Sequence, residues 1–260
     1  MVSSIAEARC TDALPLANRR VVVTGWHNRA MARRPGIFGP AQDWPEQDLI
    51  AFSAEFDEGL VLAAYTEGVF PMPLHESGFA QMGWWSPLHR GVLPLDAVRI
   101  PRSLRKSAQH YTTTIDAAFT AVLDRCADPR RKHGWIDADV RRVYTALHRT
   151  GRAHSVETWD AEGRLVGGLY GMSMGGLFAG ESMFHDPQYG RDASKVALLA
   201  LVGLLSDEHA EERIIDVQWQ TDHLATLGVI EVEREEYLGL LAEALSVPEP
   251  AWPVREEDHA

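Results

Sequence analysis

Apolar side chains recur at helical spacing between residues 57 and 68. Leu60, Val61 and Tyr65 fall on one side of such a helix, because residues three or four apart share a face. Gly68 can end the helix, since glycine readily adopts the left-handed backbone found at helix C-termini. This segment is therefore predicted to be a helix that packs through one face.

Two aspartates are placed to begin two further amphipathic helices. Asp116 precedes Phe119 and other apolar residues at helical spacing, and Asp137 precedes a similar run that starts at Val140 and stops before Gly151. An aspartate caps a helix by accepting a hydrogen bond from a backbone N–H of the first turn. We predict a helix after each aspartate.

The second half of the chain changes to strand-like patterning. Residues 154–159, 164–174 and 177–184 are predicted to be antiparallel strands separated by turns. An almost wholly apolar helix follows at 194–206, and a strand and a helix come after residue 213. This order indicates an α+β fold with a mixed sheet. It is similar to the layout of GNAT-type acyltransferases, in which the acyl donor lies where two strands splay apart.

The patterns divide the chain into two domains. Prolines in Phe70–Pro73 exclude a helix interior there, and we predict a small N-terminal α/β domain over residues 1–95, with an extended N-terminus. Val21–Val23 resembles a short strand in that extension. Residues 96–247 form the predicted GNAT-like catalytic domain, and residues 248–260 form an acidic, mobile tail.

The net charge of −12 argues against general binding to nucleic acid, but residues 99–154 have the opposite sign. This segment holds 12 Lys and Arg against 5 Asp and Glu, a balance of +7. Such a surplus suggests one surface that faces a polyanion, although charge runs are more often solvated helix faces. The clustered cations are Arg102, Arg105, Lys106, Arg130, Arg131 and Lys132.

The two cysteines, Cys10 and Cys126, lack the spacing of metal ligands, and so low a number is typical of a reducing compartment. No apolar run approaches the roughly 20 residues of a membrane span. The first ten residues contain no apolar signal-peptide core. We therefore expect a cytoplasmic protein without membrane contact or a metal site.

Three polar residues stand out within the apolar second half. Asp216 and Gln218 lie two residues apart in a predicted buried strand, so they share a face, and Glu181 lies near the end of another strand. Burying such groups is costly unless they bond each other or a ligand. Spacing alone leaves two interpretations open, an internal hydrogen-bonded pair that fixes the fold or a functional site.

The loop at residues 185–195 lacks the glycine-rich pattern that holds the pyrophosphate of coenzyme A, which weakens that donor. Ser194 and Lys195, at the predicted start of a helix, can still hold a phosphate. The motifs of zinc proteases, serine hydrolases and P-loop nucleotide binding do not occur.

Several short motifs occur in a fixed order between about residues 55 and 240. They include Trp84-Trp85-Ser86-Pro87, Gly180-Glu181-Ser182-Met183-Phe184, Ala193-Ser194-Lys195 and Ile215-Asp216 followed by Gln218. Together they make the chain resemble leucyl/phenylalanyl-tRNA–protein transferases.

The resemblance implies an aminoacyltransferase with a small N-terminal domain and a GNAT-like catalytic domain. Such enzymes transfer leucine, phenylalanine or methionine from aminoacyl-tRNA to the N-terminal amine of proteins that begin with Lys or Arg, which marks these proteins for degradation. The family uses neither a metal nor coenzyme A, so no cofactor is expected. The chain is expected to act as a monomer.

The resemblance also implies roles by position. Glu181, Asp216 and Gln218 are the catalytic positions around the reacting ester and the acceptor amine, and which of them handles the proton is left open. The basic clusters above should contact the tRNA. The positions expected to bind substrate are Trp135, Phe178, Met72, Trp84, Trp85, Ser194 and Leu201. The family often has tryptophan in place of Met72 and can have an aromatic residue in place of Leu201.

Two alternatives remain at this level. A CoA-dependent GNAT-type N-acyltransferase would share the predicted sheet, but the loop at residues 185–195 speaks against it. A non-catalytic relative that binds tRNA or peptides would share the fold without the activity. The joint presence of Glu181, Asp216 and Gln218 speaks against that relative.

Overall fold

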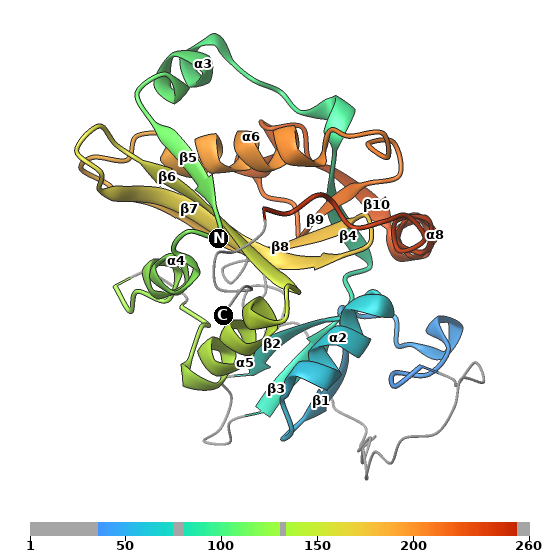
Figure 1. The fold of residues 1–260 in the computed structure, drawn as a ribbon. Helices are drawn as coiled ribbons and strands as arrows, with labels where there is room; N and C mark the ends of the chain where they lie inside the picture. The colour runs from blue at the N-terminus through green and yellow to red at the C-terminus, as the bar shows by residue number, and fades with distance from the viewer. Residues whose placement is uncertain (1–35, 75–80, 131–133, 254–260) are drawn as a thin grey trace.

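The structure is a computed structural model that describes residues 36–74, 81–130 and 134–253. It contains two β-sheets, of which the smaller is antiparallel with strand order β1-β3-β2 (Figure 1). Its strands are β1 (Leu49–Ser53), β2 (Phe70–Leu74) and β3 (Gln81–Trp85), and helix α2 (Glu58–Thr66) packs against β2. The predicted helix at residues 57–68 is therefore confirmed, whereas Val21–Val23 lies outside the described residues.

The larger sheet has the strand order β10-β4-β9-β8-β7-β6-β5. All of its pairings are antiparallel except that between β8 and β9, which confirms the predicted α+β class with a mixed sheet. Its strands are β4 (His89–Pro94), β5 (Thr112–Ile115), β6 (Ala153–Trp159), β7 (Leu165–Met174), β8 (Leu177–His185), β9 (Ile214–Gln218) and β10 (Ile230–Glu233). Strand β4 precedes residue 95 yet pairs in this sheet, so the chain crosses from the small sheet to the large one before that point.

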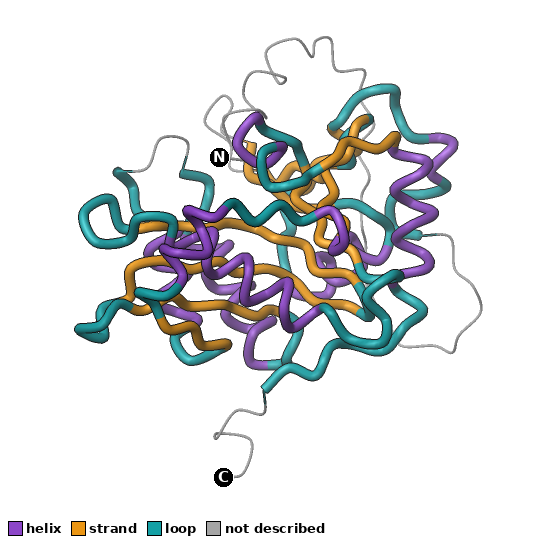
Figure 2. The backbone as a smooth tube through the Cα atoms, turned by 90° about the horizontal axis from the view of Figure 1, so that it is seen from above, coloured by secondary structure: helices purple, strands orange, loops and turns teal. Residues whose placement is uncertain are grey.

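Helices cover both faces of the larger sheet. Helix α6 (Ala193–Leu205) lies across one face, and α4 (Phe119–Cys126) and α5 (Ala138–Arg149) lie on the other (Figures 1 and 2). The other helices are α3 (Arg102–Ala108), α7 (Asp222–Ala225), α8 (Arg234–Ala244) and the short 3-10 turns Ala41–Asp43 and Leu95–Ala97. Within the described ranges, no helix combines the length and apolar character needed to cross a membrane.

The two capping predictions had different outcomes. Asp137 caps α5 as predicted, by accepting a hydrogen bond of 2.9 Å from the Val140 N–H. The prediction for Asp116 was wrong, because this residue has a φ of 57° and does not cap α4. Its carboxylate instead accepts the Ser155 N–H at 2.9 Å and contacts the His154 ring at 2.6 Å. The segment before α4 is thereby tied to β6.

Residues 248–253, the described part of the predicted acidic tail, pack against the larger sheet. The ring of Trp252 stacks on His154 with centroids 3.9 Å apart, and its indole N–H donates to the Ser173 hydroxyl at 3.0 Å. The same ring lies 5.9 Å from that of Phe178. This part of the chain is thus held against the sheet by aromatic packing and a hydrogen bond.

Strands β8 and β9 pair only at their beginnings. The register joins Leu177–Ala179 to Ile214–Asp216, although β8 continues to His185. The connection between the two strands runs through α6, which packs on the sheet and leaves β9 parallel to β8. The divergence of these neighbouring strands gives room for a cavity near the middle of the sheet.

Candidate active site

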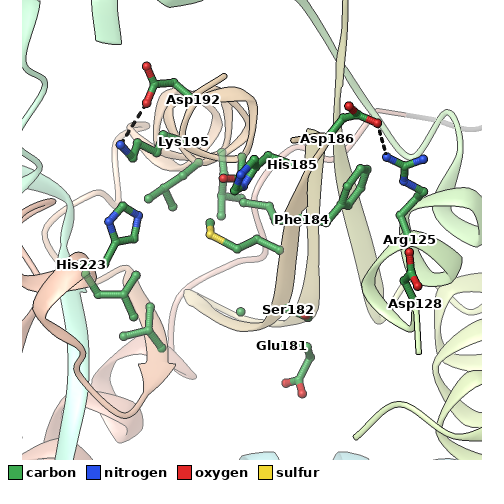
Figure 3. A pocket seen from close by; sticks show the side chains of 18 of the residues that line it. Arg125, Asp128, Glu181, Ser182, Phe184, His185, Asp186, Asp192, Lys195 and His223 are labelled. Atoms are coloured by element: carbon green, nitrogen blue, oxygen red, sulfur yellow. Dashed lines mark hydrogen bonds and ion pairs between the residues drawn. The ribbon is translucent and has the colours of Figure 1, made fainter. Parts of the chain in front are cut away.

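A cavity of about 1210 Å³ opens where β8 and β9 diverge (Figure 3). Its most deeply buried lining is apolar and comes from β7, β8, α6 and β9, with the side chains of Leu169, Phe178, Leu198, Leu201 and Ile215. Glu181 from β8 places a carboxylate in the wall. The cavity therefore combines an apolar floor, suited to a hydrocarbon side chain, with one buried acid.

Arg90 on β4 and Asp216 on β9 form a buried ion pair. The guanidinium donates to the two carboxylate oxygens at 2.8 and 2.6 Å, and the two side chains are 1% and 0% exposed. Tyr237 of α8 donates a third hydrogen bond to this carboxylate at 3.0 Å. Burial alone would lower the pKa of Arg90, but Asp216 outweighs burial and holds that pKa above its ordinary value.

Arg90 also binds the N-terminal part of the chain. It donates to the Gly68 carbonyl oxygen at 3.0 Å, just after α2, and lies over the Phe70 ring at 4.8 Å from its centroid. The ion pair with Asp216 therefore links the end of α2 and the start of β2 to the centre of the larger sheet.

Gln218 ends β9 in a strained conformation. Its φ is 61°, in the left-handed region that few residues other than glycine adopt. The Asp216 carboxylate accepts the Gln218 backbone N–H at 2.9 Å and so stabilises this bend. Gly91 on the neighbouring β4 makes room for the bend, since a Cβ there would lie 2.8 Å from the Gln220 nitrogen.

The side-chain amide of Gln218 is 1% exposed, and neither its nitrogen nor its oxygen has a hydrogen-bond partner among the described residues. A buried amide without partners is unfavourable by roughly 1–3 kcal/mol. Such a group at a bend that the fold itself stabilises is available to a ligand.

Glu181 has a different environment from Asp216. Its carboxylate accepts a hydrogen bond from the Tyr65 hydroxyl, which lies 3.1 Å from the Tyr144 hydroxyl. Burial raises the pKa of Glu181 from 4.5 to about 8, against the opposing effect of the two phenols, and Asp216 adds to the increase. Glu181 is therefore largely protonated at neutral pH until a cation comes close.

Charged pairs surround the mouth of the cavity. Arg125 contacts Asp186 at 2.8 Å, and Lys195 contacts Asp192 at 3.0 Å (Figure 3). His223 lies beside Lys195, and burial, Lys195 and His185 lower its pKa below 6.5. The mouth thus carries cations from α4 and α6 whose carboxylate partners lie in the segment between β8 and α6.

The structure brings five of the predicted catalytic and substrate-binding residues to the cavity. These are Glu181, Trp135, Phe178, Ser194 and Leu201. Asp216 and Gln218 do not contribute to its lining in the described part of the chain, but both are nearly fully buried on β9, immediately before and after the lining residue Val217.

Three predicted residues lie elsewhere. Met72, Trp84 and Trp85 belong to the small sheet and its core, and none is among the described residues that line the cavity. Trp85 packs edge-on against Trp219, with centroids 5.9 Å apart. Trp84 donates to the Ser53 hydroxyl at 2.9 Å. The structure therefore gives these tryptophans packing partners within the fold.

The predicted basic residues fall into three groups. Arg102, Arg105 and Lys106 are exposed on α3. Arg130 lines the cavity mouth, but it is bonded to Asp128 at 2.7 Å. Arg131 and Lys132 lie outside the described residues.

Sequence reasoning missed four polar partners of the catalytic positions. They are Arg90, Tyr237, Tyr65 and Tyr144. A signal existed for Arg90, because it is a lone charge just before the apolar residues Val92 and Leu93. The tyrosines looked like ordinary helix residues. The packing of α2 and α5 brings the hydroxyls of Tyr65 and Tyr144 together, and α8 carries Tyr237 to Asp216.

Comparisons with known proteins point to one family. The family described as leucyl/phenylalanyl-tRNA protein transferase matches residues 92–242, and its N-terminal domain matches residues 54–88. The chain is 43% identical over 214 residues to the leucyl/phenylalanyl-tRNA–protein transferase of Pseudoalteromonas atlantica, which covers 80% of this chain and 88% of that one. It is 46% identical over 196 residues to the protein of the same name from Rhizorhabdus wittichii, which covers 74% of this chain and 76% of that one.

Similarity to solved structures is distant. A tandem GNAT protein from the clavulanic acid biosynthesis pathway superimposes with a TM-score of 0.36 at 16% identity, covering 72% of this chain and 62% of that one.

Proposed function

Because the chain belongs to the leucyl/phenylalanyl-tRNA protein transferase family, we propose that it moves leucine, phenylalanine or methionine from tRNA onto proteins that begin with Lys or Arg. The chain is an aminoacyltransferase that acts on aminoacyl-tRNA and the N-terminus of a protein. The identity of the donor side chains and of the acceptor's first residue is proposed from the site.

One observation carries the proposal, the placement of a buried carboxylate in the wall of an apolar cavity. The floor formed by Phe178, Leu201 and Ile215 offers no polar partner to a donor side chain, which suits leucine, phenylalanine and methionine. Glu181 lies in the same cavity and can pair with the ammonium or guanidinium of an acceptor that begins with Lys or Arg. An uncharged acceptor would leave Glu181 protonated and without an ionic partner.

The reaction needs a neutral α-amine, whose ordinary pKa is near 8. The amine nitrogen attacks the ester carbonyl carbon, a C–N bond forms, and the C–O bond to the ribose of the terminal adenosine breaks. The amine loses a proton, and the released ribose hydroxyl gains one. Because the ester is already activated, positioning the two reactants can supply much of the rate.

Gln218 and Asp216 take different parts in this scheme. The free amide oxygen of Gln218 can accept a hydrogen bond from the amine as positive charge develops on its nitrogen. Asp216 acts as a positioning residue, because its oxygens already accept from Arg90, Tyr237 and the Gln218 backbone. It holds the Gln218 bend and supplies a fixed negative field.

The test is incubation with labelled leucyl-tRNA and three peptides that differ only in the first residue, which is arginine, citrulline or alanine. Citrulline keeps the shape of arginine without its charge, so the arginine peptide should be preferred and Glu181→Gln should remove most of this preference. Equal use of arginine and citrulline by the wild type would contradict the role of Glu181. Transfer from none of the leucyl-, phenylalanyl- and methionyl-tRNAs would sink the proposed function.

A further inference from the structure

The first turn of α6 faces the cavity mouth. Ser194 and Lys195 from this turn line the cavity, and Leu198 and Leu201 from the same helix form part of its apolar floor. The N-terminus of a helix of this length presents unpaired backbone N–H groups and a partial positive charge, both of which favour an anion. This feature alone is common to many helices.

Ser194 provides an independent sign of a ligand. The residue is 7% exposed, it lines the cavity, and its hydroxyl has no hydrogen-bond partner anywhere in the described chain. Unlike the side-chain amide of Gln218, this oxygen is not fully enclosed by the protein, so it is open to the cavity. A hydroxyl left free in a cavity wall is therefore placed to donate to an acceptor atom that occupies the cavity.

The charges around this turn favour an anionic ligand. Asp192, which directly precedes this turn, is shared by Lys195 at 3.0 Å, Arg191 at 3.9 Å and the Ser107 hydroxyl at 3.0 Å. Two cations thus face one carboxylate. His223 adds an imidazole whose pKa is lowered by burial and by Lys195, so an incoming anion would favour its protonation.

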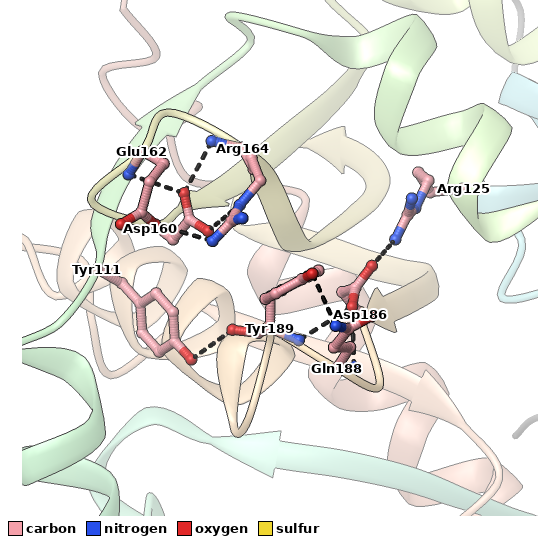
Figure 4. A network of polar contacts seen from close by, with 8 residues as sticks. All are labelled: Tyr111, Arg125, Asp160, Glu162, Arg164, Asp186, Gln188 and Tyr189. Atoms are coloured by element: carbon pink, nitrogen blue, oxygen red, sulfur yellow. Dashed lines mark hydrogen bonds and ion pairs between the residues drawn. The ribbon is translucent and has the colours of Figure 1, made fainter.

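The basic helix α3 lies close to the first turn of α6. Helix α3 contacts α6, and Ser107 at the end of α3 donates to Asp192. Just beyond it, the Tyr111 hydroxyl donates to the carbonyl oxygens of Arg191 at 2.9 Å and Tyr189 at 3.3 Å; Figure 4 shows how Tyr111 meets this loop. The exposed cations of α3 are Arg102, Arg105 and Lys106. They place positive charge on the helix that contacts α6, where a polyanion backbone can bind.

We propose that Ser194, Lys195 and His223 form the subsite for the phosphodiester that joins the terminal adenosine of the donor tRNA to the nucleotide before it. The inference rests on the proposed function, since it names the part of the donor that lies at the mouth. From Ser194 to Leu201 the helix rises about 10 Å at 1.5 Å per residue. This length matches an aminoacyl-adenosine whose side chain lies on the floor and whose 5′ oxygen lies at the first turn.

The test compares two small donors, 3′-leucyl-adenosine, which lacks the phosphodiester, and 3′-leucyl-CpA, which contains it. With an arginine peptide as acceptor, the wild type should show a higher kcat/KM for leucyl-CpA. Lys195→Met should lower the ratio of the two kcat/KM values about tenfold, and Ser194→Ala should lower it severalfold. Lys195 is partly exposed, so its replacement should leave folding intact.

Matched controls are Arg149→Met, an exposed cation on α5, and Ser206→Ala, at the opposite end of α6. Both should keep the wild-type ratio. An unchanged ratio in Lys195→Met and Ser194→Ala would overturn the subsite, and so would equal losses with both donors. Saturable binding of coenzyme A that Lys195→Met weakens would assign the same residues to a pyrophosphate and also overturn it. Transfer from neither donor nor leucyl-tRNA would instead reject the proposed function itself.

Discussion

Asp216 and Glu181 lie on neighbouring strands, and both are almost completely buried, yet their surroundings give them different properties. Asp216 faces a guanidinium that binds both of its oxygens. Glu181 faces two phenols, which donate hydrogen bonds but carry no charge that could offset burial. The residue type therefore does not determine the role; the partner does. One acid is held by an ion pair within the fold, and the other has a raised pKa because burial is not offset by a directly bonded cation.

Removing the Arg90 guanidinium, which distinguishes Asp216 from Glu181, should have the largest effect on stability and activity. Arg90→Met leaves the Asp216 carboxylate buried without its counter-ion, which costs about 3–5 kcal/mol in comparable buried pairs. We expect a large fall in melting temperature and loss of transfer activity. Arg213→Met is the matched control, since Arg213 is 1% exposed and binds Asp207 at 2.5 Å away from the site. That variant should lose stability but keep the specific activity of its folded fraction, and equal activity losses in both would contradict a special role for Arg90.

Asp216→Asn should give the next largest effect. It keeps the shape of the side chain but removes the charge that pairs with Arg90 and holds the Gln218 N–H. We expect single-turnover transfer from leucyl-tRNA to fall about 100-fold, as for the loss of one preorganised electrostatic group. Circular dichroism and the melting temperature would verify the fold. Wild-type turnover in a folded Asp216→Asn protein would remove Asp216 from the mechanism.

The pH dependence of stability should distinguish Glu181 from Asp216, with a smaller effect than either substitution above. The folded pKa of Glu181 is about 8, above its ordinary 4.5, so the folded state holds a proton that the unfolded state releases. This contribution to stability is complete below about 4.5 and is lost as the pH rises through about 8. Glu181→Gln mimics the protonated form, so its melting temperature relative to that of the wild type should increase between pH 5 and pH 9. A constant difference would mean that Glu181 is ionised throughout.

Tyr65→Phe should have the smallest effect. It removes one hydrogen bond to Glu181 and leaves Tyr144 nearby, at a cost of about 1 kcal/mol in stability. The Tyr65 hydrogen bond favours the ionised acid, so its loss should shift the Glu181 transition to higher pH. Melting temperatures of Tyr65→Phe across the same pH range would show this shift. A shift to lower pH would contradict the assigned contact.

The sequence predicted most elements of the larger sheet because their periodicity is strong. Local patterns predict the apolar α6, the capped α5 and three strands. These strands end at Trp159, at Met174 and at Phe184 or His185. Strands β4, β5 and β10 were missed; β5 and β10 have only four residues each and no buried run. The misplaced cap at Asp116 shows the limit of local rules, because a tertiary contact with His154 outweighs capping.

The site was predicted in part for a similar reason. Glu181, Asp216 and Gln218 were found because polar residues in apolar strands are conspicuous. Their partners Arg90 and Tyr65 are 126 and 116 residues away along the chain, and no local pattern reports such contacts. The bend at Gln218 was also missed, since it depends on Gly91 in the neighbouring strand.

Because Trp252 packs against a cavity residue, the cavity is completed by a segment that is synthesised late. Phe178, which forms part of the cavity floor, touches the ring of Trp252 on another side, and that ring is stacked on His154. Trp252 is translated well after the strands that it covers. The sheet can therefore assemble while one side of the Phe178 ring still lacks its neighbour, and the packing around this part of the cavity floor is complete only when the later segment docks.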